Sequence, residues 1–192
     1  MHPFIDFVAK NYQRFLGDST LDFCKIFHMM LHKNKTNFVI VLVGNKNLVA
    51  DSQGFISLAK LFDTLVNMRG YDGKLIVIDT DSETSQKLLN TTSDKVTVAN
   101  DDWVTVLSSL AATLEKPVDL LFFDDGANNL VANTYSKNTK PITLIDDVLD
   151  DDSILALGST QKDGKLASEI DTWADDQGKK VIVNNRIVGW VW

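Results

Sequence analysis

Cysteine is almost absent from this sequence. Cys24 is the single cysteine among 192 residues, which excludes an internal disulfide and a zinc site built from cysteines. No apolar run approaches the roughly 20 residues that a membrane-spanning helix requires. The first residues, MHPFIDFVAK, lack the basic start and the apolar stretch of a signal peptide. We therefore expect a cytoplasmic protein without a membrane span.

Positive charge is also in deficit. The chain has 19 Lys and Arg against 26 Asp and Glu, a formal net charge of −7. This balance argues against a broad nucleic-acid surface and favours a small or neutral substrate. The length and a hydrophobic content of 44% suit one domain with a proper core, with room for a small helical extension.

Motifs that bind phosphates or metals are missing as well. The chain contains neither GxGxxG nor GxxxxGK[ST], so another nucleotide-binding α/β domain is an alternative that we rank second. His28 and His32 are four residues apart on an expected helix, but no HExxH pattern surrounds them. We interpret them as ordinary surface or cap histidines and expect no metal site. Together with His2 they lie in the N-terminal segment, so no general base is evident among the histidines.

Short apolar runs that end in polar residues are what the chain does contain. The clearest is GKLIVIDTD (73–81), and Phe38–Val43 and Val118–Phe123 have the same form. An unbroken aliphatic run between turn residues is typical of a strand buried on both faces. The segments Lys95–Ala99 and Ser153–Leu157 predict two further strands.

Helical periodicity lies before and between these runs. Residues 3–32 predict two helices, the second with Ser19 and Asp22 as a capping box. A helix with Phe55 and Leu58 on its apolar face is expected after Gly54. Further helices are expected after Asp81 or Ser82, after Asp102 and over Lys165–Gln177.

The remaining segments are less regular. Residues 126–140 predict a polar loop or a weak helix, and Pro141–Leu149 a short helix or a strand. Lys180–Trp192 predicts a hairpin around Asn184-Asn185. The alternation as a whole predicts one α/β domain with a single doubly wound, mostly parallel sheet and helices on both faces. We place an N-terminal helical cover at 1–36 and the sheet domain, with its C-terminal β-hairpin, at 37–192.

The carboxyl ends of the expected strands carry polar clusters. These ends share one edge of a parallel sheet, where open α/β sheets bind ligands. A carboxylate there can accept hydrogen bonds from a ribose diol, an acid or amide can face an adenine, Trp103 can lie flat against a purine, and a glycine lets backbone approach closely. Each cluster is also a common turn or cap, and a lone Trp is more often a core residue. The clusters are Gly44-Asn45, Asp79-Thr80-Asp81, Asn100-Asp101-Asp102 and Asp124-Asp125.

The order and spacing of these segments resemble class I S-adenosylmethionine-dependent methyltransferases, closest to the small O-methyltransferase-like group. The resemblance covers roughly residues 37–190. It rests on VIVLVG (39–44), GKLIVIDTD (73–81), KVTVANDDWVTVL (95–107), VDLLFFDDGAN (118–128), SILALGS (153–159) and VIVNNRIVGW (181–190).

The resemblance implies a Rossmann-like methyltransferase fold with S-adenosylmethionine as cofactor and a small-molecule acceptor. It implies that Asp124 is the catalytic carboxylate and Asp79 the ribose-binding acid. The implied cofactor-binding residues are Gly44, Asn45, Gly54, Asp79, Thr80, Asp101, Asp102 and Trp103.

The chain departs from the family at three places. Gly44 and Gly54 are ten positions apart, where the family has a compact glycine turn. The fifth strand ends in Leu157-Gly158-Ser159 rather than in the acid-amide pair of metal-dependent enzymes. Ala127 stands near the place of the family's histidine. These departures leave open a catalytically degenerate binding or assembly module, which could form a homo-oligomer through the apolar C-terminus with Trp190 and Trp192.

Overall fold

The computed structural model describes residues 2–33, 36–45, 49–51, 54–124, 127–136, 140–158, 164–184 and 188–191. The helices are α1 (Pro3–Asn11), α2 (Gln13–Leu16), α3 (Thr20–His32), α4 (Leu58–Val66), α5 (Ser82–Thr91), α6 (Trp103–Thr113), α7 (Asn128–Ser136), α8 (Pro141–Val148) and α9 (Lys165–Asp176), with the 3₁₀ turn η1 (Gly17–Ser19). The strands are β1 (Val39–Val43), β2 (Val49–Asp51), β3 (Gly54–Ile56), β4 (Lys74–Ile78), β5 (Val96–Ala99), β6 (Leu120–Phe123), β7 (Ile154–Leu157), β8 (Lys180–Asn184) and β9 (Val188–Val191).

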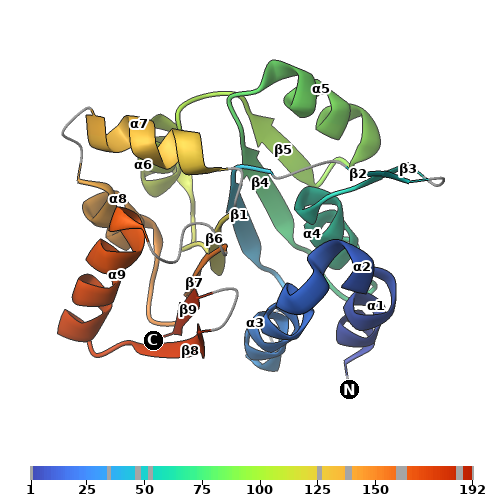
Figure 1. Cartoon of the computed structure of the whole chain (residues 1–192), viewed down its shortest axis with the longest axis horizontal. Helices are drawn as coiled ribbons and strands as arrows, with labels where there is room; N and C mark the ends of the chain where they lie inside the picture. The colour runs from blue at the N-terminus through green and yellow to red at the C-terminus, as the bar shows by residue number, and fades with distance from the viewer. Residues whose placement is uncertain are drawn as a thin grey trace.

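The main sheet confirms the predicted fold class. Its strand order is β5-β4-β1-β6-β7-β9-β8, and the five strands from β5 to β7 are parallel. The C-terminal hairpin pairs antiparallel through β9 with both β7 and β8. Because β1 is central, the chain builds one half of the sheet with β4 and β5 and then returns to build the other half with β6 and β7 (Figure 1).

The apolar strands are buried on both faces, as their unbroken runs predicted. All residues of β1, β6 and β7 are buried. Successive side chains point to opposite faces. Phe122 stacks on Phe23 of α3, with ring centroids 5.3 Å apart, whereas its neighbour Phe123 meets Trp103 of α6 edge-on at 5.2 Å.

Helices cover both faces of the sheet and define two cores. One core joins α1, α3, α4 and Leu88 of α5 to the sheet. The other joins α6, α7, α8 and α9 to the opposite face. The N-terminal helices therefore share a core with the sheet. No helix in the described part of the chain combines the length and apolar character needed to cross a membrane.

The start of α3 differs from its prediction. Ser19 precedes the helix in helical backbone geometry and makes no side-chain capping bond, so the predicted capping box with Asp22 is wrong. The turn η1 leads directly into α3, and the Thr20 hydroxyl donates to the Gly17 carbonyl over 2.7 Å. Asp22 is buried.

The segment between β1 and α4 also differs. β2 and β3 form a separate antiparallel ribbon, in which Phe55 pairs with Ala50. The helix begins only at Leu58, so placing Phe55 on its apolar face was wrong. Segment 126–140 contains the helix α7, and Pro141–Leu149 is the helix α8 rather than a strand. The predicted hairpin is present, while Asn185 in its turn lies outside the described residues.

Candidate cofactor site at the carboxyl edge of the sheet

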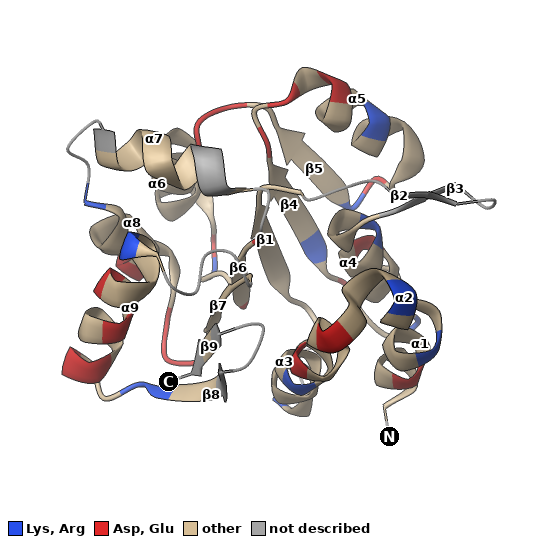
Figure 2. Cartoon of the chain, in the orientation of Figure 1, with Lys and Arg blue, Asp and Glu red and all other residues tan. Residues whose placement is uncertain are grey.

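The carboxyl ends of β1, β4, β5 and β6 lie along one edge of the parallel part of the sheet. Between β1 and β6 the order in which the chain adds strands reverses its direction. Open α/β sheets bind ligands at such a switch point, outside the carboxyl ends of the strands. In Figure 2 acidic segments follow β4 and β5 along this edge.

Asp79 follows β4 directly and connects two strand ends. Its carboxylate accepts the backbone N–H of Asp81 over 2.9 Å and also interacts with the backbone N–H groups of Thr80 and Asn45. The bond to Asn45 reaches the segment after β1. Partial burial raises the pKa of Asp79 above its ordinary value, although the backbone N–H groups act in the opposite direction. The ionised carboxylate is therefore held in place in a partly dehydrated position.

Asp81 lies two residues further on and has a different environment. It is the N-cap of α5, where its carboxylate accepts the Thr84 backbone N–H over 3.0 Å and the Thr84 hydroxyl. The Thr84 side chain is the largest cause of a pKa lowered below the ordinary value. Asp81 is exposed and accepts the hydrogen bonds of the helix start, which is the role that the sequence predicted for Asp81 or Ser82.

Gly44 and Asn45 turn the chain out of β1. Gly44 has φ +74°, a left-handed conformation that favours glycine, and its N–H donates to the Ile78 carbonyl over 2.8 Å. The Asn45 side chain is buried, and its Oδ1 accepts the Ala59 backbone N–H of α4 over 3.3 Å. Its Nδ2 is buried and has no hydrogen-bond partner among the described residues. A buried amide N–H group normally donates to an acceptor, such as a ligand oxygen or a water.

The start of α4 is capped by the chain itself. Ser57 is fully buried and accepts the Lys60 backbone N–H over 3.2 Å. With Asn45 on Ala59, two of the N–H groups in the first turn of α4 are satisfied by protein side chains. A ligand at this point would meet Asn45 Nδ2 rather than those two helix N–H groups.

The end of β5 contributes Asn100, Asp101 and Asp102. With the Asn100 amide oriented so that its nitrogen faces them, this nitrogen donates to the carbonyl oxygens of Asp79 and Thr80, each over 3.1 Å. Asp101 is exposed, and its Oδ1 accepts the Asp102 backbone N–H over 2.7 Å. Asp102 is the residue before α6. The Asn100 bonds join the end of β5 to the end of β4.

Trp103 does not lie on that surface. It is fully buried, and its indole N–H donates to Thr134 Oγ1 of α7 over 2.8 Å. Its ring packs edge-on against Phe123. The interpretation of Trp103 as a flat support for a purine is therefore wrong, and the core interpretation replaces it. Its physical role is to fasten α7 to α6 beside the strand ends.

Asp124 follows β6 next to the end of β1. Its backbone N–H donates to the Val43 carbonyl over 2.9 Å, and its own carbonyl accepts the Ala127 N–H over 2.8 Å. The residue is buried, with 5% of its surface exposed. Asp125 and Gly126, which the sequence placed in the same cluster, lie outside the described residues.

Gly54 is separated from the strand ends. It begins β3 and pairs with Asp51 beside the turn of the β2–β3 ribbon. Figure 1 shows this ribbon projecting sideways beyond α4 and α5. The segment between Gly44 and Gly54 thus includes a strand of a ribbon. The geometry brings Gly44, Asn45 and Asp79 together, with Asp124 beside them across β1.

Some contacts of this edge had no signal in the sequence. The bonds from Asn45 to Ala59 and from Asn100 to Asp79 join residues that only the fold brings together. A metal site was not expected, and no group of three or more His, Cys, Asp or Glu in the described ranges could hold a metal ion.

Comparison with known proteins gives structural matches only. No protein-family model matches the sequence, and no curated protein sequence matches it. The O-methyltransferase TomG from Streptomyces achromogenes, a structure in complex with S-adenosylmethionine, is 12% identical with a TM-score of 0.51, covering 100% of this chain and 90% of TomG. Fibrillarin from Aeropyrum pernix, with natively bound S-adenosylmethionine, is 14% identical with a TM-score of 0.50, covering 86% of this chain and 74% of fibrillarin.

The fold is therefore that of the class I S-adenosylmethionine-dependent methyltransferases. The strand order, the antiparallel strand β9 and the helices on both faces agree with it. At these identities the likeness concerns the fold, and function has to be argued from the site.

Proposed function

We propose that the chain is an S-adenosylmethionine-dependent methyltransferase that acts on a small-molecule acceptor. The observation that carries this proposal is Asp79, a partly buried carboxylate fixed by backbone N–H groups between the ends of β4 and β1. Two structural neighbours, TomG and the Aeropyrum pernix fibrillarin, contain S-adenosylmethionine, which supports the choice of cofactor.

In this proposal a ribose hydroxyl donates to the Asp79 carboxylate. The two carboxylate oxygens have about four acceptor positions between them, and the three backbone N–H groups leave about one of these positions for that hydroxyl. Thr80, Asp101 and Asp102 border the adenine. Gly44 allows close approach of the backbone, and Asn45 Nδ2 donates to an oxygen at the other end of the cofactor. We do not include Gly54 or Trp103 in this site.

Bound S-adenosylmethionine supplies an electrophilic methyl group on a sulfonium. The contribution of the chain is to hold that group in line with an acceptor oxygen or nitrogen and to keep water out. Asp124 is the candidate to take the acceptor proton, because it is a buried carboxylate at the end of β6 beside β1.

The proton-transfer role predicts a large effect of Asp124→Asn. The substitution keeps the size of the side chain and removes the base, so turnover should fall by about 100-fold or more while cofactor affinity stays normal. Turnover is measured by transfer of a labelled methyl group once an acceptor is found. Full turnover in the variant would remove Asp124 from the base role.

The function itself is tested by calorimetry with S-adenosylmethionine and S-adenosylhomocysteine. Saturable binding of both to the wild-type protein, followed by methyl transfer in an acceptor screen, would support the proposal. Absence of binding to wild-type protein would overturn it.

A binding module without turnover is the second candidate. It is favoured by the β2–β3 ribbon in place of a compact glycine turn and by the capped start of α4. Its signature is S-adenosylhomocysteine binding without methyl transfer to any acceptor. A cytoplasmic location and self-association stay predictions.

A further inference from the structure

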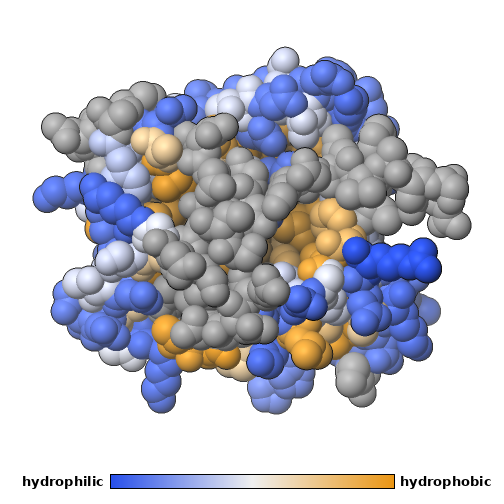
Figure 3. Space-filling view, in the orientation of Figure 1, coloured by the Kyte–Doolittle hydropathy of each residue, from blue (hydrophilic) through white to orange (hydrophobic). Residues whose placement is uncertain are grey.

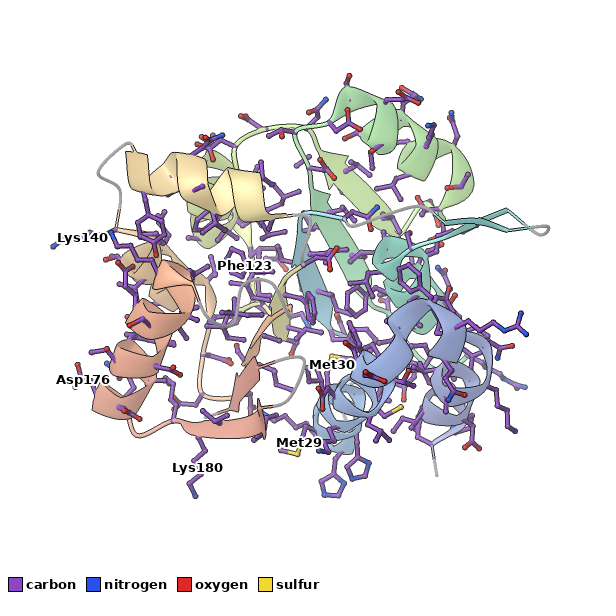
Figure 4. The ribbon with its side chains drawn as sticks, in the orientation of Figure 1. Met29, Met30, Phe123, Lys140, Asp176 and Lys180 are labelled. Atoms are coloured by element: carbon purple, nitrogen blue, oxygen red, sulfur yellow. The ribbon has the colours of Figure 1, made fainter. Side chains whose placement is uncertain are left out.

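A hollow of about 860 Å³ lies on α3, away from the carboxyl edge of the sheet. Residues of α3 form its floor, flanked by the start of α1 on one side and by Ile182 of β8 on the other. Figure 4 shows Met29 at the lower border of the molecule and its neighbour Met30 inside it. The lining residues are His2, Ile5, Leu21, Cys24, Lys25, His28, Met29, Leu31, His32 and Ile182. We call this surface the α3 groove.

The floor of the α3 groove is apolar although it faces outward. The core side of α3 is already occupied by Phe23, Ile26, Phe27 and Met30, which are buried. Leu21 is 72% exposed, the highest value among the large apolar residues that are exposed in the described part of the chain. In Figure 3 apolar surface is visible at the lower border, where Figure 1 draws α3 and β8. Small-molecule sites have volumes of this order and mostly apolar walls with a few polar groups.

The polar groups of the α3 groove have one chemical character. All three histidines of the chain line it, together with Lys25, and none of the described residues in its lining carries a carboxylate. This absence is notable in a chain with 26 acidic residues and a net charge of −7. The local balance therefore favours an anionic group over a cationic one.

The histidines have different freedom to bind a ligand. His2 is engaged, because its Nδ1 accepts the Phe4 N–H over 3.2 Å and its Nε2 lies 2.8 Å from the Tyr71 hydroxyl. His28 and His32 are exposed one helical turn apart, with nearly parallel rings whose centroids are 5.8 Å apart. Among the described residues neither makes a side-chain hydrogen bond, so each can offer an N–H to the same carboxylate.

The α3 groove is polar at one end and apolar at the other. Leu21 lies in the first turn of α3, and His28 and His32 lie in its last turns. From Leu21 to His32 the helix rises about 16 Å, at about 1.5 Å per residue. A matching ligand is elongated, with a hydrocarbon part toward Leu21 and an anionic end toward the two imidazoles. Lys25 lies between the two ends and adds a positive charge.

We propose that the α3 groove binds one molecule of a free long-chain carboxylate. The hydrocarbon chain lies along Leu21, Met29 and Ile182, and the carboxylate accepts N–H groups from His28 and His32. The flexible thioether of Met29 suits an apolar chain without a fixed shape. The proposal does not depend on the methyltransferase function, because no residue of the α3 groove belongs to the carboxyl edge.

The test is calorimetric titration of the full chain with dodecanoate and with its uncharged methyl ester, both below their aggregation concentrations. Dodecanoate should bind with one site per chain and about tenfold more tightly than the ester, because charge-assisted hydrogen bonds are lost in the ester. The double variant His28→Gln, His32→Gln should reduce this preference, and Lys25 accounts for what is left of it. Equal affinity of both compounds for the wild-type protein would overturn the carboxylate assignment.

A matched pair of variants tests the location. Leu21→Glu puts a charge into the apolar end and should weaken dodecanoate binding by about tenfold or more. Leu89→Glu makes the same change at another exposed leucine, on α5 and outside the α3 groove, and should leave binding unchanged. Circular dichroism checks that both variants fold. An equal effect of the two variants, or no saturable binding to wild-type protein, would overturn the proposal.

Two further measurements separate other occupants. Co-sedimentation with phosphatidylglycerol vesicles that Leu21→Glu abolishes would point to a lipid surface in place of a free carboxylate. A dimer in sedimentation velocity that Leu21→Glu disperses would point to a second copy of the chain. Either result would overturn the proposal, and a monomer that ignores vesicles and binds dodecanoate supports it.

Discussion

Asp79 and Asp81 are separated by one residue, yet the pKa values of their carboxyl groups are shifted in opposite directions at the end of β4 and the start of α5. Burial raises the pKa of Asp79, whereas hydrogen bonds from Thr84 lower the pKa of Asp81. Asp81 accepts the hydrogen bonds of a helix start and is exposed. Asp79 connects the ends of β4 and β1 from a position where its charge is disfavoured.

The difference separates a structural carboxylate from a candidate binding one. A cap such as Asp81 stabilises the helix that it begins, and its contribution needs no ligand. A charge kept in a dehydrated position at a switch point is explained more readily by function than by stability. The two positions therefore provide matched variants, because the same substitution at each should affect different properties.

The largest expected effect is that of Asp79→Ala on cofactor binding. Loss of the hydrogen bond from a ribose hydroxyl to this carboxylate should weaken S-adenosylhomocysteine binding by about 100-fold. Calorimetry measures the affinity directly. Asp81→Ala is the matched control and should bind normally, and equal losses in both variants would remove the distinction between the two carboxylates.

The next effect concerns the β1 side of the site. Asn45→Ala and Ser57→Ala each remove one side-chain acceptor from the first turn of α4, and each should reduce the free energy of unfolding by about 1 kcal/mol. Only Asn45→Ala also removes the unpaired Nδ2 donor. We expect about a tenfold loss of S-adenosylmethionine affinity for Asn45→Ala alone. Chemical denaturation and calorimetry measure the two quantities, and a loss of affinity in both variants would assign it to α4 capping.

A smaller effect is expected for Asp81→Ala on stability. The variant leaves the Thr84 N–H and hydroxyl without their acceptor. Its thermal midpoint should fall slightly below that of the wild-type protein at pH 7. The difference should shrink as the pH falls through the lowered pKa of Asp81. Protonation of Asp81 in the wild-type protein then removes the charge that the substitution removes in the variant. A midpoint independent of this substitution would contradict the capping role.

The smallest expected effect is a gain in stability from Asp79→Asn. A carboxylic acid whose pKa is raised by folding contributes stability that is present below its unfolded pKa and lost as the pH rises through the folded pKa. Neutral Asn avoids that loss, so Asp79→Asn should melt slightly above the wild-type protein at pH 7, and the difference should vanish below about pH 4. Thermal denaturation across this range measures it, and a lower midpoint at pH 7 would show that the ionised carboxylate stabilises the fold.

Much of the fold could be predicted because its strands are buried on both faces. The unbroken runs in β1, β4 and β6 have no other stable place than the centre of a covered sheet, and alternation with helices implies parallel pairing. The β2–β3 ribbon could not be predicted in this way. It pairs three residues with three, and such short strands carry too little periodicity to be distinguished from a loop.

The candidate site was predictable in position and less so in detail. Polar residues after parallel strands must share an edge, which brought Asp79, Asn45 and Asp124 near one another. Trp103 could not be assigned from its neighbours in sequence, because its burial depends on Thr134 and Phe123 from elsewhere in the chain. Asn45 was singled out for its place after β1, while its contact with Ala59 depends on the fold.

The most direct test of the account is a double-mutant cycle between Asp79 and the ribose hydroxyls. Calorimetry would compare S-adenosylhomocysteine with its 2′,3′-dideoxy analogue on wild-type protein and on Asp79→Ala. If Asp79 binds the ribose, the missing hydroxyls should cost about 100-fold in affinity on the wild-type protein and almost nothing on the variant. An equal loss on both proteins, or no binding of S-adenosylhomocysteine to the wild-type protein, would contradict the assignment of Asp79.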